Sequence, residues 1–431
     1  MKPIVLFCLS AAVPLLTAKS QTATDSLRLF DIRASALSHD PRSAQLELIA
    51  SQSALRLRNI DADLKPTLSF ESQAQYQSDV ATIPISLPGI TVPRPPHDTY
   101  DASLNANQRI FDPSLSSRRA VERAQTVESQ ARVRTALYSI SESVNTAFFT
   151  ALRSQSQVAE LQTTLTDIEA QISVADARVK AGTALPSESD ALKAELLRWR
   201  QAVAELAAAR KAAVAVLSDL IGRPIDPSVP LAAPDLSTTV ATARSVADLR
   251  DRPEYQQFQA TRDVLDKTGD ALSSQLKPRL SAFGRAGYGR PGLNSLSDKF
   301  DSYWLTGIQL QWSPWNWGLT SRDRQINSLQ RDFVTAEEKA FTAALKRSVE
   351  QDNASIDRLD TALLQDDEII ALREKIFAET RKRYAEGVIT SADYVDKQTD
   401  VLAARLSRAS HRVELAQARA HLLTTLGIEV R

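Results

Sequence analysis

The chain has 431 residues, of which 43% are hydrophobic, and its 52 basic side chains balance its 52 acidic ones. This length is sufficient for two or three ordinary domains, and a net charge of zero gives no electrostatic basis for nucleic-acid binding. The four histidines lie far apart without the spacing of a metal site, and no phosphate-binding loop or nucleophile motif occurs. We therefore expect no catalytic residue, no metal, no cofactor and no enzyme.

Residues 1–20 have the pattern of a secretory signal peptide. Lys2 precedes an apolar stretch at 4–16, and small residues follow it. The only cysteine, Cys8, lies in this stretch, and Val5-Leu6-Phe7 before it is a poor lipobox, so we do not expect a lipoprotein. A buried N-terminal helix is the alternative interpretation.

The rest of the sequence predicts no helix that spans a membrane, because no later stretch holds on the order of 18 consecutive apolar residues. If the chain crosses a membrane, it must therefore do so with β-strands. The mature chain would have no cysteine, which suits an oxidising compartment without the need for disulfides.

Two copies of one unit are recognisable in the sequence. At an offset of 212 residues, the recurring features are Pro41 and Pro253, Lys65-Pro66 and Lys277-Pro278, Leu68 and Leu280, and Tyr76 and Tyr288. At an offset of 204 residues, they are Tyr100 and Trp304, Phe111 and Trp315, and Arg118 and Arg322. We place the first structural repeat at 21–222 and the second at 248–431, joined by a proline-containing linker at 223–247.

Each repeat is predicted to contain a helix, two strands and a long helical hairpin, the hairpins at about 114–221 and 316–427. Apolar or small residues recur every three or four positions from Leu137 to Val179, and again from Val395 to Leu423. Such a sustained period predicts left-handed coiled-coil packing. Since no proline interrupts 114–185, we expect one wall helix about 100 Å long at about 1.5 Å per residue. On the helices alone, a helical bundle or filament rod is the alternative.

Four segments change to a period of two residues. They are about 67–76, 100–111, 279–288 and 303–312. Each has one apolar face and one polar face over about ten residues, which is the length of a tilted transmembrane strand with lipid outside and water inside. A soluble, half-buried strand alternates in the same way, so the evidence is the occurrence of four matched strands behind a signal peptide.

Tryptophans flank the last predicted strand, with Trp304 at one end and Trp312, Trp315 and Trp317 at the other. Tryptophan favours both interfaces of a bilayer, so we expect these rings at the membrane interface, with core packing as the alternative. Open strand edges are not tolerated in lipid, and spanning barrels have about eight or more strands. A chain with four strands must therefore oligomerise to close a barrel.

The chain with these features resembles the TolC-type outer-membrane efflux proteins, and the resemblance extends over residues from about 26 to 431. The most specific matches are the strand-to-helix junctions RIFDPSLSSRR (109–119) and WSPWNWGLTSR (312–322), and the second hairpin tip, KRYAEGVITSADYVDKQTDVLAAR (382–405). The first tip, RVKAGTALPSESDALKAE (178–195), matches less well. If Asp190 corresponds to Asp393, two extra residues separate it from the preceding glycine.

The resemblance implies a mainly α-helical, duplicated protein with a β-barrel part. Three chains would form a homotrimer whose twelve-stranded transmembrane β-barrel, four strands per chain, continues into a long coiled-coil tunnel through the periplasm. The linker and the C-terminus would form a belt around the tunnel. This channel would be the passive exit duct of a tripartite efflux pump or type I secretion system in the outer membrane of a Gram-negative bacterium.

The resemblance also implies partners and site residues. The partners would be a periplasmic adaptor protein, an inner-membrane transporter and outer-membrane lipid, without nucleic acid. Gly182, Gly387 and Val388 at the hairpin tips would contact the adaptor, although both glycines also suit a left-handed turn that simply reverses the chain.

The periplasmic aperture would be gated by Asp393, Asp396 and Tyr384. The two aspartates lie three residues apart on one helix face, so three chains would place six carboxylates in one constriction that favours cations. For Asp393 the alternative is a capping role with Thr390, and for Asp396 it is a solvated surface position. The family often has an arginine where this chain has Ile389.

A periplasmic coiled-coil structural or adaptor protein is the alternative function. An adaptor would carry a single helical hairpin with a lipoyl-like β module, and a structural coiled coil would not need four alternating strands or the proline-rich loop at 77–99. Recovery of the protein without detergent would favour either alternative. With one methionine and no cysteine in the mature chain, we do not expect a relay for soft metal ions.

Overall fold

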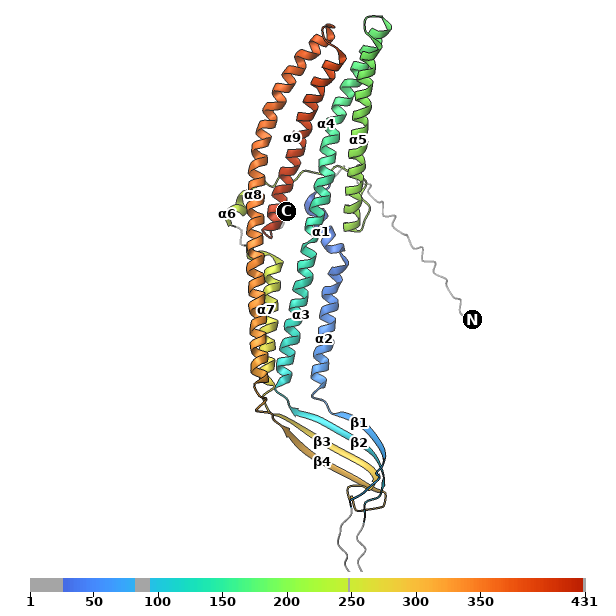
Figure 1. The fold of residues 1–431 in the computed structure, drawn as a ribbon, viewed down its shortest axis with the longest axis vertical. Coiled ribbons are helices and arrows are strands. Elements are labelled where there is room, and N and C mark those ends of the chain that lie inside the picture. Colours follow the sequence, from blue (N-terminus) through green and yellow to red (C-terminus); the bar gives the residue numbers. More distant parts are fainter. Residues whose placement is uncertain (1–25, 82–93, 247–248, 429–431) are drawn as a thin grey trace, which may run out of the picture.

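The computed structural model describes residues 26–81, 94–246 and 249–428. The expected signal peptide at 1–20 and the middle of the loop at 77–99 lie outside these ranges. Within them the molecule is elongated, with long helices that run to two hairpin tips at one end and a curved four-stranded sheet at the other (Figure 1).

The first part of the chain runs from the middle of the molecule to the sheet and then to the first tip. Its elements are α1 (Leu29–His39), a 3-10 turn (Pro41–Ala44), α2 (Gln45–Ala62), β1 (Thr67–Tyr76), β2 (Asp98–Phe111), α3 (Ser114–Tyr138), α4 (Ile140–Lys180) and α5 (Pro186–Ile221). A connection that contains α6 (Ser237–Val246) follows, and it lies beside the middle of the helices (Figure 1).

The second part repeats this path. Its elements are a short 3-10 turn (Leu249–Asp251), α7 (Pro253–Ser274), β3 (Arg279–Arg290), β4 (Asp301–Gln311), α8 (Leu319–Ala385) and α9 (Ser391–Thr425). The 67-residue α8 runs from the sheet to the second tip as one helix, and no proline lies within it (Figure 1).

The corresponding wall helix of the first part runs from Ser114 to Lys180 as expected, with a local tightening at Ser139, whose φ of −63° and ψ of −20° remain helical. It is divided at Ser139 into α3 and α4, where the backbone N–H of Glu142 donates to the Ser139 carbonyl in a tighter, 3-10-like turn. The adjoining Tyr138 donates its hydroxyl to the Thr424 carbonyl and lies under the Arg252 guanidinium. Contacts with distant parts of the chain therefore tighten the helix at this point.

The four strands pair in sequence order and are all antiparallel. One apolar row crosses the whole sheet, because Phe70 pairs with Leu104, Leu104 with Ala286, and Ala286 with Trp304. The opposite face carries polar side chains, among them Asp101, which accepts hydrogen bonds from Arg285 and Tyr303. The predicted alternation of an apolar and a polar face is therefore present in the sheet.

The sheet does not close within one chain. In the described ranges, β1 pairs only with β2, and β4 pairs only with β3. Both outer strands consequently present a row of backbone N–H and C=O groups at an open edge.

The helices pack side by side in two groups. Near the sheet the contacts run from α2 to α3, from α3 to α7 and from α7 to α8, and near the tips they run from α5 to α4, from α4 to α9 and from α9 to α8. The predicted heptad positions Ile168 and Ala175 are buried, as are Leu192 and Trp199 of the neighbouring helix. A second core around Phe148 lies at mid-height, where α1, α4, α5 and α9 meet.

The predicted fold class is confirmed, since the chain is mainly helical, repeats one order of elements and contributes one four-stranded antiparallel sheet. Among the helices of the described residues, none combines the length and the apolar character needed to cross a membrane.

Candidate functional site

The second hairpin tip reverses the chain between α8 and α9. Gly387 has φ 76°, and the Val388 N–H donates to the Arg383 carbonyl at 2.9 Å, so the end of α8 is closed by a left-handed glycine. A Cβ at Gly387 would meet no heavy atom within 4 Å, which means that the backbone angle, and not lack of space, favours glycine. Val388 beside it is exposed and available to another molecule.

The first tip is built in the same way. Gly182 has φ 69°, and the Thr183 N–H donates to the Arg178 carbonyl at 3.0 Å. Helix α5 begins at Pro186 and α9 at Ser391, each four residues after its glycine. The matching of Asp190 with Asp393 was therefore wrong, because Glu188 occupies the third helical position in α5 as Asp393 does in α9, and no residues are inserted.

Asp393 caps the start of α9. Its Oδ2 accepts hydrogen bonds from the Thr390 hydroxyl at 2.7 Å and the Thr390 N–H at 3.1 Å, and its own N–H donates to the Thr390 hydroxyl at 3.3 Å. The hydrogen bond from the Thr390 hydroxyl, together with that from its N–H, lowers the pKa of Asp393. In this conformation Asp393 therefore has the capping role that was the alternative interpretation, with its carboxylate ionised and directed at Thr390.

Asp396 lies one turn further along α9, and its side chain is 67% exposed. Its only partner in the described ranges is Lys397, whose Nζ donates to Oδ2 at 2.6 Å. Lys397 also lies 3.6 Å from Asp400, so it is shared between two carboxylates. Of the two predicted gate aspartates, Asp396 is thus the one that takes no part in the helix cap, and its exposed carboxylate pairs with Lys397.

Tyr384 is only 3% exposed and lies in the core between the two hairpins. Its ring centroid is 4.9 Å from that of Tyr394, and burial raises the pKa of Tyr394 to about 12. Arg178 of the first tip lies over the Tyr384 ring, 5.7 Å from its centroid, and donates to the backbone carbonyls of Tyr384 and Ala385. Sequence reasoning did not single out Arg178, because its partners are backbone atoms about 200 residues away.

The four predicted interface tryptophans are all exposed. Trp304 lies in β4 near the loop end of the sheet, whereas Trp312, Trp315 and Trp317 follow β4 at the helix end. The Trp312 indole donates to the Leu276 carbonyl at 3.0 Å, and the Trp315 and Trp317 rings meet edge to face at 6.0 Å. The core-packing alternative does not describe these rings within a single chain.

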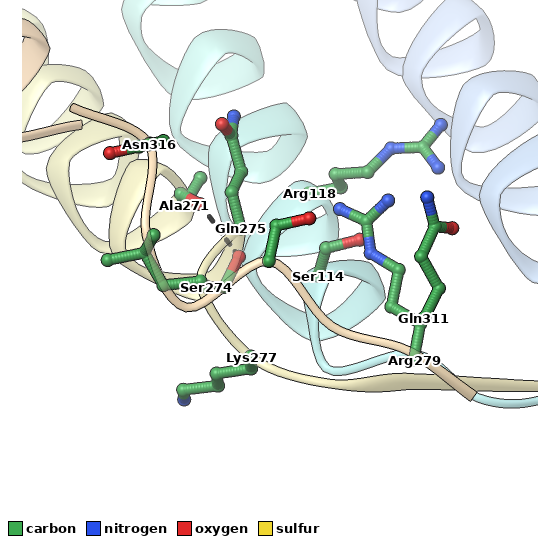
Figure 2. Close-up of a pocket in the computed structure, with 11 residues that line it drawn as sticks. Ser114, Arg118, Ala271, Ser274, Gln275, Lys277, Arg279, Gln311 and Asn316 are labelled. Carbon is green, nitrogen blue, oxygen red and sulfur yellow. Dashed lines mark hydrogen bonds between the residues drawn. The ribbon is translucent and has the colours of Figure 1, made fainter. Parts of the chain in front are cut away.

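A cavity of about 370 Å³ lies where the sheet joins the helices, and Figure 2 shows its lining. Arg279 and Gln311 rise side by side from the ends of β3 and β4 toward Arg118, whereas Lys277 points to the other side. Arg118 is paired with Asp63, and Arg279 lies 3.5 Å from Asp112, so both arginines have an acidic partner within the chain. In the parts of the chain that are described, no group of His, Cys, Asp and Glu side chains is arranged to hold a metal ion.

One family model, described as outer membrane efflux protein, matches residues 32–223 and 246–428. The chain belongs to this family. The efflux protein matches no curated protein sequence, but it is similar to solved outer-membrane channels at low identity. VceC of Vibrio cholerae is 14% identical with a TM-score of 0.67, covering 93% of this chain and 96% of VceC.

Two further channels have the same fold. MtrE of Neisseria gonorrhoeae, in its open state, is 19% identical with a TM-score of 0.66, covering 93% of this chain and 89% of MtrE. CmeC of Campylobacter jejuni is 13% identical with a TM-score of 0.65, covering 99% of this chain and 94% of CmeC. Family membership confirms the predicted resemblance, the outer-membrane location and the assignment as an efflux channel protein and not an enzyme.

Membership in the family orients the long molecule. The sheet is the outer-membrane part, so the helices extend from it into the periplasm and the two tips lie farthest from the membrane (Figure 1). The apolar row through Phe70 and Trp304 is then the face suited to lipid, and the face that carries Asp101 and Arg285 is the one suited to water.

Proposed function

We propose that three copies of this efflux protein assemble into the exit duct of a tripartite efflux pump or type I secretion system. The observation that carries the proposal is the sheet of four strands, apolar on one face, polar on the other and open at both edges. Lipid does not tolerate unpaired edges, so β4 of each copy would pair with β1 of the next. Three sheets would then close a barrel of twelve strands.

The helices support the same arrangement, because apolar side chains lie on both edges of the helical wall. Helix α2 exposes Leu48 and Leu55, seven residues apart, and α8 exposes Ile326 and Phe333, also seven residues apart. Leu55 precedes the end of α2 by as many residues as Ile326 follows the start of α8. The two apolar seams therefore lie at matching heights above the sheet, and a neighbouring copy would cover them.

Engineered cysteines test this assembly, since Cys8 in the predicted signal peptide is the only native one. The pairs Leu55→Cys with Ile326→Cys and Leu48→Cys with Phe333→Cys should form disulfide-linked dimers and trimers in outer-membrane extracts. Moving the α2 cysteine from Leu55 to Arg56 turns it about 100° around the helix and should abolish the cross-link. A monomeric mass in detergent, or recovery without detergent, would replace the channel with the coiled-coil alternative.

We also propose that the tips are the regulated end of the duct. Gly182, Gly387 and the exposed Val388 shape the surface for a periplasmic adaptor, which an inner-membrane transporter would accompany. Asp396 would face the aperture, while Asp393 holds the start of α9 in place. Tyr384 would act from within the contact between hairpins, because its side chain is buried.

The contact of the tips with an adaptor is tested by placing a photo-crosslinking side chain at Val388. Cross-linking to a periplasmic protein that copurifies with an inner-membrane transporter is the expected result. The same photo-crosslinking side chain at Lys339, in the part of α8 closer to the sheet, is the control and should not capture this protein. Equal capture from both positions would contradict an adaptor site at the tips.

A further inference from the structure

The two repeats differ at the start of their long wall helices. In the first repeat, Asp112 lies just before α3, and its Oδ1 accepts hydrogen bonds from the N–H and hydroxyl of Ser114 at 2.9 and 2.7 Å. Arg109 and Arg279 lie 3.6 and 3.5 Å from the same carboxylate. The chain itself thus supplies the negative charge that a helix N-terminus and nearby arginines favour.

In the second repeat, the residue at the matching position is Asn316, which carries no charge. Its amide donates to the Thr320 hydroxyl at 2.7 Å. The residue before α8 is Gly318, which has no side chain to cap the helix, and the first turn of α8 contains no acidic residue. The N–H of Leu319 donates to the Asn316 carbonyl at 3.1 Å, so the first turn of this long helix meets a neutral acceptor and no anion from the described part of the chain.

A groove of about 570 Å³ opens beside this helix start. Its lining residues include apolar Leu276, Pro314 and Trp315, and the polar Ser321. Arg324 is the one charged residue of the lining, and within the described ranges it has neither an ion pair nor a hydrogen bond. The groove thus combines an apolar wall with an unbalanced positive charge.

One wall of the groove is hydrogen-bonded to the apolar face of the sheet. Trp312 continues the apolar face of β4, and its indole donates to the Leu276 carbonyl, which belongs to the groove. Trp317 beside it is 81% exposed although its φ of 55° is a strained, left-handed angle for a bulky residue. The exposed indole of Trp317 therefore lies just beyond the end of β4, where the membrane interface is expected.

We propose that this groove binds the phosphate of an anionic phospholipid from the periplasmic leaflet of the outer membrane. The phosphate would accept hydrogen bonds from the N–H groups of Thr320 and Ser321, the Ser321 hydroxyl and the Arg324 guanidinium. The acyl chains would lie against Trp315 and the apolar face of β4. Exposed Lys277, next to Leu276, adds positive charge at the same depth. The inference rests on the proposed insertion of the sheet into the membrane.

The test measures phosphatidylglycerol that remains bound to the full assembly, by native mass spectrometry from mixed detergent micelles. Asn316→Asp supplies the carboxylate that the first repeat already has, so it should keep the helix start intact and lower the bound lipid by about 5-fold or more. Arg324→Gln should lower it to a similar extent. Lys339→Gln, which removes a charge farther along α8, is the matched control and should retain the lipid of the unmodified protein.

Equal retention by Asn316→Asp, Arg324→Gln and the unmodified protein would overturn the inference. Variants that dissociate the assembly without selective loss of phosphatidylglycerol would assign the groove to the contact between copies instead. Displacement of the lipid by millimolar inorganic phosphate would identify a site for free phosphate. Channel conductance distinguishes failure of the lipid site from failure of the proposed function. A protein that conducts without bound lipid contradicts only the lipid site, whereas one that never inserts into a bilayer contradicts the proposed function.

Discussion

Asp393 and Asp396 are a single helical turn apart, but their side chains have different surroundings and therefore different expected roles. The Asp393 carboxylate is engaged by both the hydroxyl and the N–H of Thr390, while the side chain of Asp396 is two-thirds exposed and meets only Lys397. The Asp393 carboxylate is fixed in the helix cap, whereas the exposed Asp396 shares its one cationic partner, Lys397, with Asp400. Ion selectivity at the tip should therefore depend mainly on Asp396.

Replacing Asp396 with asparagine should lower the cation-to-anion permeability ratio by roughly 2- to 5-fold, because a like-charged ring focuses its counter-ions. Reversal potentials in planar bilayers under a salt gradient measure this ratio. Asp396→Glu keeps the charge and should keep the ratio. An unchanged ratio in Asp396→Asn would remove this residue from the ion path.

The sequence predicted Asp393, Asp396 and both tip glycines at positions where the structure has a cap, an exposed carboxylate and two left-handed turns. These features are local, since each depends on neighbours within a few residues. The partners of Tyr384 and Arg178 were not predictable in this way, because they meet across two hairpins. Gate assignments by resemblance carry a position in the chain, but not the direction in which its side chain points.

At the scale of helices, the contact between the two hairpins of a chain depends on few polar links. Arg178 provides one of them at the tips, where it donates to carbonyls at the C-terminal end of α8, the end that favours positive charge. Arg178→Gln should loosen the tips and speed amide hydrogen exchange in 383–392 several-fold. Lys180→Gln, in the same tip, is the control and should exchange as the unmodified protein does.

Within the second hairpin, α8 and α9 are linked near mid-height, where His421 Nδ1 lies 2.8 Å from Asp352. The hydrogen bond to Asp352 raises the pKa of His421, to which Glu142 at 4.0 Å also contributes and which Arg252 opposes. A raised pKa in the folded state means that protonated His421 stabilises the fold below about pH 6.5, its unfolded value, and that this stabilisation is lost as pH rises through the folded pKa.

His421→Gln should therefore lower the melting temperature more at pH 6 than at pH 9. Thermal unfolding followed by circular dichroism across this range measures the difference. His97, which lies in the sheet end of the molecule, provides the matched control, and His97→Gln should not reproduce the pH dependence. A loss that is the same at both pH values would mean that the pair contributes only as a neutral hydrogen bond.

The tightened turn at Ser139 illustrates the limit of sequence patterns at this scale. The heptad from Leu137 onward predicted helix correctly, because period and burial agree along α4. The tightened turn contains no proline or glycine that would predict it, and it coincides with contacts of Tyr138 to Thr424 and Arg252. The heptad pattern of one segment cannot predict a tightened helical turn that depends on contacts with distant segments.

The whole molecule is incomplete as a single chain, because the wall helices α2 and α8 expose apolar seams as the outer strands expose open edges. Phe333→Asp would place a charge in the seam between copies, so the trimer should dissociate at a lower detergent concentration or temperature. Size-exclusion chromatography with light scattering measures this. Lys339→Asp, on the polar side of the same helix, should leave the assembly intact, and equal behaviour of both variants would argue against the seam.

The open edges of the sheet also bear on how such a protein reaches its membrane. A newly exported chain can bury most of its helical core alone, since the two apolar clusters lie within one copy. Its strands cannot satisfy their outer N–H and C=O groups until sister chains arrive, and until then they are templates for aggregation. The helices of each copy should thus fold first, and the strands should pair late and cooperatively, when the copies meet.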